Sequence, residues 1–113
     1  MKYALLLYDN PASWENVSEQ EMKSLYADYM AVSDEPETYG GAELHPPQTA
    51  KTLSMRNGEL LITDGPFTET KEIISGIYLV DADSEERALE LAQRIPTLSK
   101  MDGVIEVRRI VER

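Results

Sequence analysis

The stretch Tyr3-Ala4-Leu5-Leu6-Leu7-Tyr8 is apolar at every position, and Asp9-Asn10-Pro11 follows it directly. A short apolar run with turn residues behind it is typical of a β-strand that is buried on both faces. Residues 73–80 have the same character, and Gly76 within them indicates a bulge. Their alternation places Ile77 and Leu79 opposite Ile74, Tyr78 and Val80. The sequence therefore predicts a sheet with two apolar faces.

Two amphipathic helices are predicted beside these strands. The first begins with the capping box Ser18-Glu19-Gln20-Glu21, in which the serine hydroxyl accepts from the glutamate amide, and it ends before Gly40-Gly41. The second begins at Asp83 or Ser84 and ends at Pro96. Each carries its apolar residues on one face, so each is expected to pack on the sheet.

A hairpin and a final strand complete the expected elements. Asn57-Gly58 is the preferred two-residue hairpin turn because both positions tolerate positive φ, and it joins residues 51–55 to residues 59–63. Residues 42–56 are otherwise expected to be irregular and extended, and residues 104–111 form the last strand. The order is β-α-β-β-α-β with an extra extended segment, which predicts an α+β, ferredoxin-like fold with an antiparallel sheet.

Two helices cover only one face of such a sheet, yet the first strand places Tyr3, Leu5 and Leu7 on one side and Ala4, Leu6 and Tyr8 on the other, so one of these apolar sets is left without cover. An uncovered apolar face in a protein usually indicates a partner. We therefore expect a homodimer that packs sheet against sheet, with the chain itself as the partner.

The aromatic residues are assigned to packing. Trp14 is expected to cover the open end of the sheet, and Tyr26, Tyr29 and Tyr78 are expected to be core residues.

Composition limits the class of protein. The length predicts a single domain over residues 1–113. The 21 acidic and 11 basic residues give a net charge of −10, which argues against direct binding to nucleic acid or to a membrane surface. Without cysteine and with His45 as the single histidine, no metal site is expected, and no cofactor-binding loop is recognisable. The N-terminus lacks a signal-peptide pattern, so the expected location is cytoplasmic.

The segment Asp64-Gly65-Pro66-Phe67-Thr68-Glu69-Thr70-Lys71-Glu72 concentrates polar and ionisable groups behind a tight turn. Asp64, Phe67, Glu69 and Lys71 are the candidate ligand-binding residues. The alternative is that Asp64 only organises the turn while Phe67 fills the core. Asp64 and His45 are the candidate catalytic residues, because a carboxylate can orient a histidine for proton transfer.

The same nine residues resemble the signature of the DGPF-motif branch of the YCII-related family. Leu44-His45-Pro46-Pro47 and Arg94-Ile95-Pro96 add to a resemblance that covers the whole chain. The resemblance implies a dimeric α+β barrel and no firmly established reaction, with some members occurring beside alternative sigma factors. It also implies a proposed enzymatic His/Asp pair in the wider group. The predicted first helix, residues 18–34, contains no histidine, so that pair does not transfer to this chain.

Three functions are compatible with these residues. The first, which we favour, is a module that binds a small molecule or regulates, because no nucleophile, metal set or cofactor loop is recognisable. The second is a cofactor-free enzyme that uses Asp64 or His45 for acid–base chemistry. The third is an interaction partner of a transcription (sigma) factor through the acidic surface. A cavity that holds His45 and Asp64 within hydrogen-bond reach would favour the enzyme.

Overall fold

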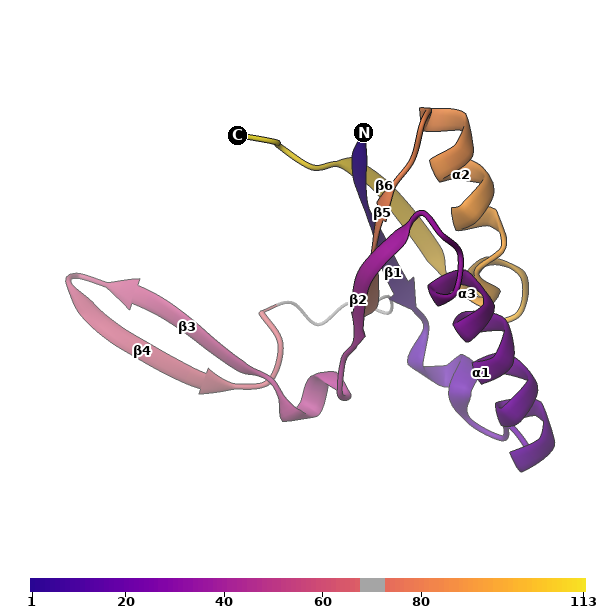
Figure 1. Cartoon of the computed structure of the whole chain (residues 1–113). Helices are drawn as coiled ribbons and strands as arrows, with labels where there is room; N and C mark the ends of the chain where they lie inside the picture. Colours follow the sequence, from indigo (N-terminus) through magenta and orange to yellow (C-terminus); the bar gives the residue numbers. More distant parts are fainter. Residues whose placement is uncertain (68–72) are drawn as a thin grey trace.

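The computed structural model describes residues 1–67 and 73–113 (Figure 1). The elements in chain order are β1 Lys2–Asp9, α1 Glu19–Ser33, β2 Thr38–Glu43, β3 Lys51–Arg56, β4 Glu59–Asp64, β5 Ile73–Asp81, α2 Glu85–Gln93, α3 Pro96–Ser99 and β6 Val104–Arg109. Short 3₁₀ turns occupy Pro11–Trp14 and Pro47–Thr49.

The main sheet has the strand order β2-β5-β1-β6, and its paired strands are all antiparallel. Helices α1, α2 and α3 lie together on one side of it (Figure 1). Within the described part of the chain, strands β3 and β4 pair only with each other and form a separate hairpin. This arrangement confirms the predicted α+β, ferredoxin-like fold.

The core lies between the sheet and the helices. Along β1, buried residues alternate with partly exposed ones, which puts Leu5 and Leu7 against the helices. Leu91 and Ile95 pack onto them and are fully buried. Burial of each such side chain contributes about 1.5–3 kcal/mol to folding.

Two local signals act as the sequence predicts. The Ser18 hydroxyl accepts from the Glu21 amide at 3.1 Å and donates to the Glu21 carboxylate at 3.0 Å, so α1 begins with a formed capping box. Asn57 and Gly58 both have positive φ, at 51° and 81°, so the hairpin has the expected primed turn.

Strand β2 was not predicted, because its two glycines were interpreted as the stop behind the first helix. In the structure Gly40 and Gly41 pair with Leu79 and Tyr78 of β5. A Cβ atom at Gly41 would lie 2.6 Å from the Ile77 carbonyl oxygen, a distance that real Cβ atoms do not tolerate. The glycines therefore permit close approach of two strands here, as glycine does where backbones come together.

The predicted bulge beside Gly76 is present, and it corrects the orientation of Ile74. The register of β5 on β1 shifts between Leu7, which pairs with Gly76, and Tyr8, which pairs with Ile74. Paired residues share a face of a sheet, so Ile74 lies on the side of Tyr8. The expectation that Ile74 shares a side with Tyr78 was wrong, because the extra residue Ser75 changes the alternation.

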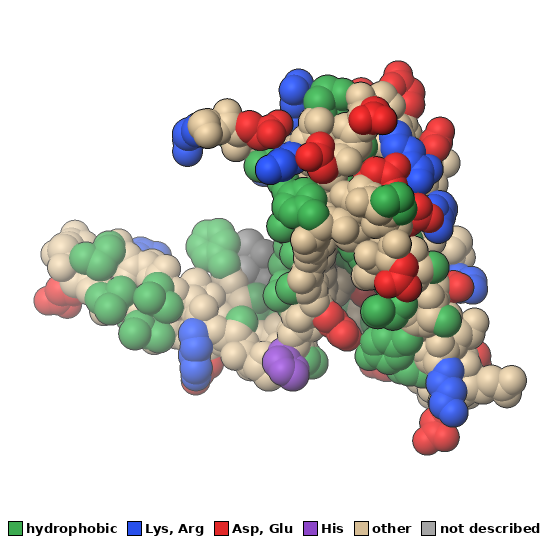
Figure 2. Space-filling view, viewed as in Figure 1, with side chains coloured by type: hydrophobic (Ala, Val, Ile, Leu, Met, Phe, Trp, Pro, Cys, Tyr) green, Lys and Arg blue, Asp and Glu red, His purple; other side chains and the backbone are tan. Residues whose placement is uncertain are grey.

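The face of the sheet that points away from the helices is apolar over its two central strands. Its side chains there are Ala4, Leu6, Tyr8, Ile74, Ile77 and Leu79. The hairpin β3–β4 extends away from the sheet, and hydrophobic side chains gather on it (Figure 2). The exposed large hydrophobic residues of the hairpin are Leu53, Met55, Leu60, Leu61 and Ile62.

Candidate functional site

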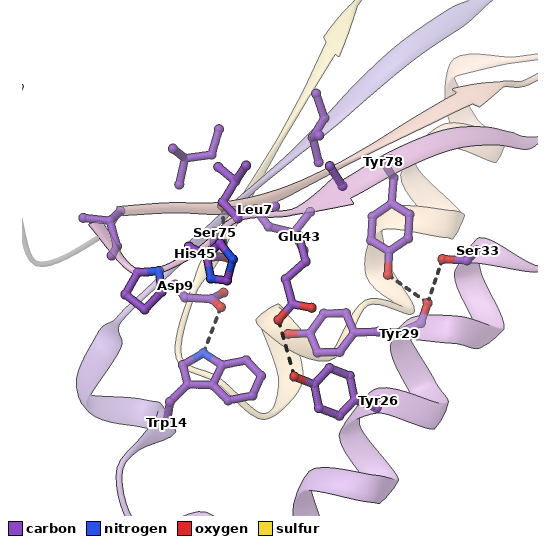
Figure 3. A pocket seen from close by; sticks show the side chains of 18 of the residues that line it. Leu7, Asp9, Trp14, Tyr26, Tyr29, Ser33, Glu43, His45, Ser75 and Tyr78 are labelled. Carbon is purple, nitrogen blue, oxygen red and sulfur yellow. Dashed lines mark hydrogen bonds between the residues drawn. The ribbon is translucent and has the colours of Figure 1, made fainter. Parts of the chain in front are cut away.

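A cavity of about 870 Å³ opens between α1, the edge strand β2 and the adjoining end of β5. Figure 3 shows its lining side chains, with Tyr26 and Tyr29 contributed by α1 and Trp14 contributed by the turn after β1. The volume lies within the ~300–1,000 Å³ that small-molecule sites usually have. The cavity is therefore large enough for a small organic ligand.

Missing side chains explain why this space is open. Gly41 pairs with Tyr78, and Gly76 pairs with Leu7 and Glu43, so two neighbouring positions of the sheet carry no Cβ. Both glycines line the cavity. A Cβ at Gly76 would lie 3.1 Å from the Ala42 carbonyl oxygen, a tighter contact than most real Cβ atoms make, so a side chain here would require a small shift of β2.

Asp9 is the buried charge of the site, with 4% of its surface exposed. It ends β1, and its Oδ2 accepts from Nε1 of Trp14 at 2.9 Å (Figure 3). Among the described residues, Oδ1 has no hydrogen-bond partner. Buried polar atoms are nearly always hydrogen-bonded, so an unpartnered carboxylate oxygen in a cavity wall is a candidate contact for a ligand.

Tyr29 links α1 to two other elements. Its hydroxyl shares a hydrogen bond of 2.9 Å with the buried Thr97, and its carbonyl accepts from the Tyr78 hydroxyl at 2.8 Å. Its ring stacks on Trp14 with centroids 6.4 Å apart. Burial raises the pKa of Tyr29 to about 12, and burial also raises the pKa of Tyr78. Both phenols are therefore neutral near pH 7.

The second acidic group of the cavity is Glu43, at the end of β2. Tyr26 donates to Glu43 Oε1 at 3.4 Å, and the two side chains point at one another in Figure 3. The charge of Glu43 and partial burial raise the pKa of Tyr26. Tyr26 therefore acts as a hydrogen-bond donor, not as a phenolate.

The structure separates the two candidate catalytic residues. His45 is exposed and lines this cavity, and it also lines a smaller cavity of about 550 Å³ beside Phe67 and Pro66. Asp64 ends β4 on the hairpin, pairs with Lys51, and lines neither cavity. The two predicted ligand-binding residues Glu69 and Lys71 lie outside the described residues.

Two assignments of aromatic residues to the core are corrected. Phe67 is 87% exposed, so it does not fill the core. Tyr26 is also exposed, because it lines the open cavity. Tyr78 is buried as predicted. Tyr29 is only half-buried and lines the cavity.

Sequence reasoning missed Asp9, Tyr26 and Glu43 as site residues. Asp9 was interpreted as a strand terminator and Tyr26 as part of an apolar helix face. No sequence signal separates the two faces of this strand, because residues 3–8 are apolar at every position; the alternation that buries Asp9 is visible only in the structure.

Within residues 1–67 and 73–113, no group of three or more His, Asp or Glu side chains could hold a metal ion. In the same ranges no helix combines the length and the apolar character needed to cross a bilayer.

Fold and cavity together define a small ferredoxin-like α+β domain with a pocket between its first helix and its sheet. The profile of the YCII-related domain family matches residues 1–113. An uncharacterised protein of Rhizobium meliloti (strain 1021) is 35% identical over 112 residues, which cover 96% of this chain and 90% of that relative. The chain belongs to the YCII-related domain family, as the sequence resemblance implied.

Proposed function

We propose that this protein binds a small organic molecule in the cavity between α1 and β2. The observation that carries the proposal is Asp9, a buried carboxylate in the cavity wall with one oxygen free among the described residues. Aromatic rings from Trp14 and Tyr29 lie beside it. A mainly apolar cavity with a few convergent polar groups is the usual form of a ligand site.

Binding fits these residues better than acid–base catalysis does. The phenols of Tyr26, Tyr29 and Tyr78 already take part in hydrogen bonds, and their raised pKa values keep them protonated near pH 7. A general base must lie within hydrogen-bond reach of its substrate and have a pKa close to the operating pH. His45 and Asp64 do not line one cavity together, so their predicted partnership gains no support.

A dye titration tests the proposal. N-phenyl-1-naphthylamine, a neutral dye that emits in apolar surroundings, is expected to bind saturably. Met30→Trp, at the exposed mouth of the cavity, should weaken binding at least fivefold because the larger ring fills the entrance. Leu89→Trp is the matched control, since Leu89 is an exposed helix residue of α2 that does not line the cavity. Absence of saturable binding, or equal affinity in both variants, would show that the cavity is not a binding site.

We further propose that the functional unit is a homodimer formed through the uncovered sheet face. Surface area supports this assembly. The chain of 12.8 kDa exposes 8003 Å², which is about 1,700 Å² more than a typical monomer of that mass exposes. Stable interfaces bury about 800 Å² on each partner, so the excess is sufficient for one. The apolar sheet face and hairpin are the surfaces whose burial would remove it.

A further inference from the structure

We propose that the ligand of the α1–β2 cavity is a protonated primary amine carried on a flat or elongated apolar body. This inference rests on the proposed binding function and names the chemistry of its ligand.

The charges in the cavity wall have one sign. Asp9 and Glu43 are the carboxylates of the lining, and no Lys or Arg belongs to the lining among the residues that the structure describes. The exposed His45 lies at the Pro46-Pro47 end. The net charge of −10 adds to the negative potential around the cavity. A ligand with a carboxylate or phosphate head would meet repulsion on entry, and a cation would meet attraction.

The hydrogen-bonding groups of the cavity favour a ligand that donates a hydrogen bond. The ring donors beside the two carboxylates are in use, because Trp14 donates to Asp9 and Tyr26 to Glu43, and Tyr78 donates to the Tyr29 carbonyl. Among the described residues, the buried side-chain atom without a hydrogen-bond partner is an acceptor, Oδ1 of Asp9. Asp9 is 96% buried, so its free oxygen has lost most of its contact with water. A charged N–H donor compensates for this loss most effectively. A quaternary ammonium has no N–H and satisfies this oxygen less well.

The walls fit the rest of such a ligand. The stacked rings of Trp14 and Tyr29 lie next to Asp9, and rings of this kind attract an ammonium group over their faces. Leu7, Met22 and Met30 supply apolar surface further along the cavity. An aryl or alkyl chain attached to the amine would therefore be buried while the head contacts Asp9.

Three probes with one body and different heads test the proposal. They are 4-phenylbutylamine, 4-phenylbutan-1-ol and 4-phenylbutyrate, which carry a cation, a neutral donor and an anion. Binding is measured by calorimetry and by the emission of Trp14, which is the only tryptophan of the chain. We expect the amine to bind at least tenfold more tightly than the alcohol, and the acid to bind more weakly than either. The trimethylammonium analogue of the amine should bind no more tightly than the alcohol.

Isosteric variants assign the preference to particular carboxylates. Asp9→Asn should reduce amine affinity at least tenfold and leave alcohol affinity within threefold, because the amide cannot neutralise the cation. Glu43→Gln, at an exposed residue, should reduce amine affinity about threefold without affecting the fold. Asp83→Asn is the matched control, since Asp83 is exposed and does not line the cavity, and it should change nothing.

The outcomes separate this inference from the binding function itself. Equal binding of amine and alcohol, or tighter binding of the acid, would overturn the amine assignment while the cavity remains a binding site. Failure of all three probes and of N-phenyl-1-naphthylamine would overturn both. Circular dichroism shows whether Asp9→Asn is folded. If it is unfolded, Glu43→Gln takes its place as the test, and an unchanged amine affinity in Glu43→Gln would contradict the proposal.

Discussion

Tyr29 is the residue at which the cavity and the core meet. Its ring forms part of the cavity wall, and its hydroxyl and carbonyl tie α1 to Thr97 of α3 and Tyr78 of β5. Burial raises the pKa of Tyr29, so ionising its phenol at alkaline pH costs stability. Because the folded value of about 12 lies above the ordinary tyrosine value of 10.0, the stability that comes from keeping this phenol neutral is fully present below pH 10 and is lost as the pH rises through 12.

Tyr29→Phe should therefore flatten the alkaline stability profile. At pH 7 the variant should lose about 1–3 kcal/mol in the free energy of unfolding, since the buried Thr97 hydroxyl loses its partner. Between pH 10 and 12 the difference from the unmodified protein should shrink. Urea unfolding at pH 7, 10, 11 and 12 measures both effects.

Tyr39→Phe is the control for this prediction, because Tyr39 is an exposed residue of β2. It should stay within about 0.5 kcal/mol of the unmodified protein, as exposed substitutions usually do. A difference between Tyr29→Phe and the unmodified protein that is constant from pH 7 to 12 would contradict the assigned titration.

Among the elements, those with strong local signals could be predicted. The apolar run of β1, the capping box at Ser18 and the Asn57-Gly58 turn each determine structure through contacts within a few residues. Strand β2 could not be predicted in the same way. Its sequence Thr38-Tyr39-Gly40-Gly41-Ala42-Glu43 has little β propensity, and it is a strand because β5 pairs with it from far along the chain.

The site was harder to predict than the fold for the same reason. The cavity exists because Gly41 and Gly76, which are distant in sequence, become neighbours beneath α1. No local pattern reports that a helix face will lie over glycines instead of over side chains. Tyr26 therefore looked like a core residue, and Asp9 looked like the end of a strand.

The hairpin should be separable from the rest of the fold. Gly65 donates to the Ala50 carbonyl at 2.8 Å, so the two ends of the hairpin already lie together. Replacing residues 51–64 by Gly-Gly should leave the circular dichroism of the remaining domain native, because β3 and β4 pair with no other strand among the residues that the structure describes. The same change should weaken the proposed dimer at least tenfold, measured by sedimentation equilibrium.

A double substitution gives the matched comparison for this deletion. Leu60→Thr with Ile62→Thr keeps the strand character of β4 while removing exposed apolar surface. It should weaken association less than the deletion does. An unfolded deletion variant, or one that associates as tightly as the full chain, would contradict the assigned role of the hairpin.

At the scale of the whole molecule, the chain is a thin body measuring 46 × 44 × 18 Å. Helices cover one face, and the apolar face of the sheet and the extended hairpin remain open (Figures 1 and 2). Such a shape has little interior for its surface, which small domains tolerate poorly. A second copy packed on the uncovered sheet face would double the thickness of the body and bury the apolar side chains of that face.

Charge on that face should separate the copies. Ile77→Glu places a carboxylate beside Leu6 on the uncovered face, and burying that charge in an interface would be costly. Light scattering at 50 µM should therefore report two chains for the unmodified protein and one for the variant. Leu89→Glu on α2 is the control and should remain dimeric. A monomeric unmodified protein, or an Ile77→Glu dimer, would show that this face is not the interface.

The hairpin has a consequence for the order of events during folding. Hairpins of this size close within about 1–10 μs, but an isolated pair of strands is only marginally stable in water. If the second copy supplies its cover, the last folding step is bimolecular, and its rate rises in proportion to protein concentration. At low expression the β3–β4 hairpin would remain uncovered for the longest time. During that time its unpaired strand edges are exposed to incorrect association with other chains. The concentration of the protein, and not only its sequence, then determines which fraction of the chains folds without misassembly.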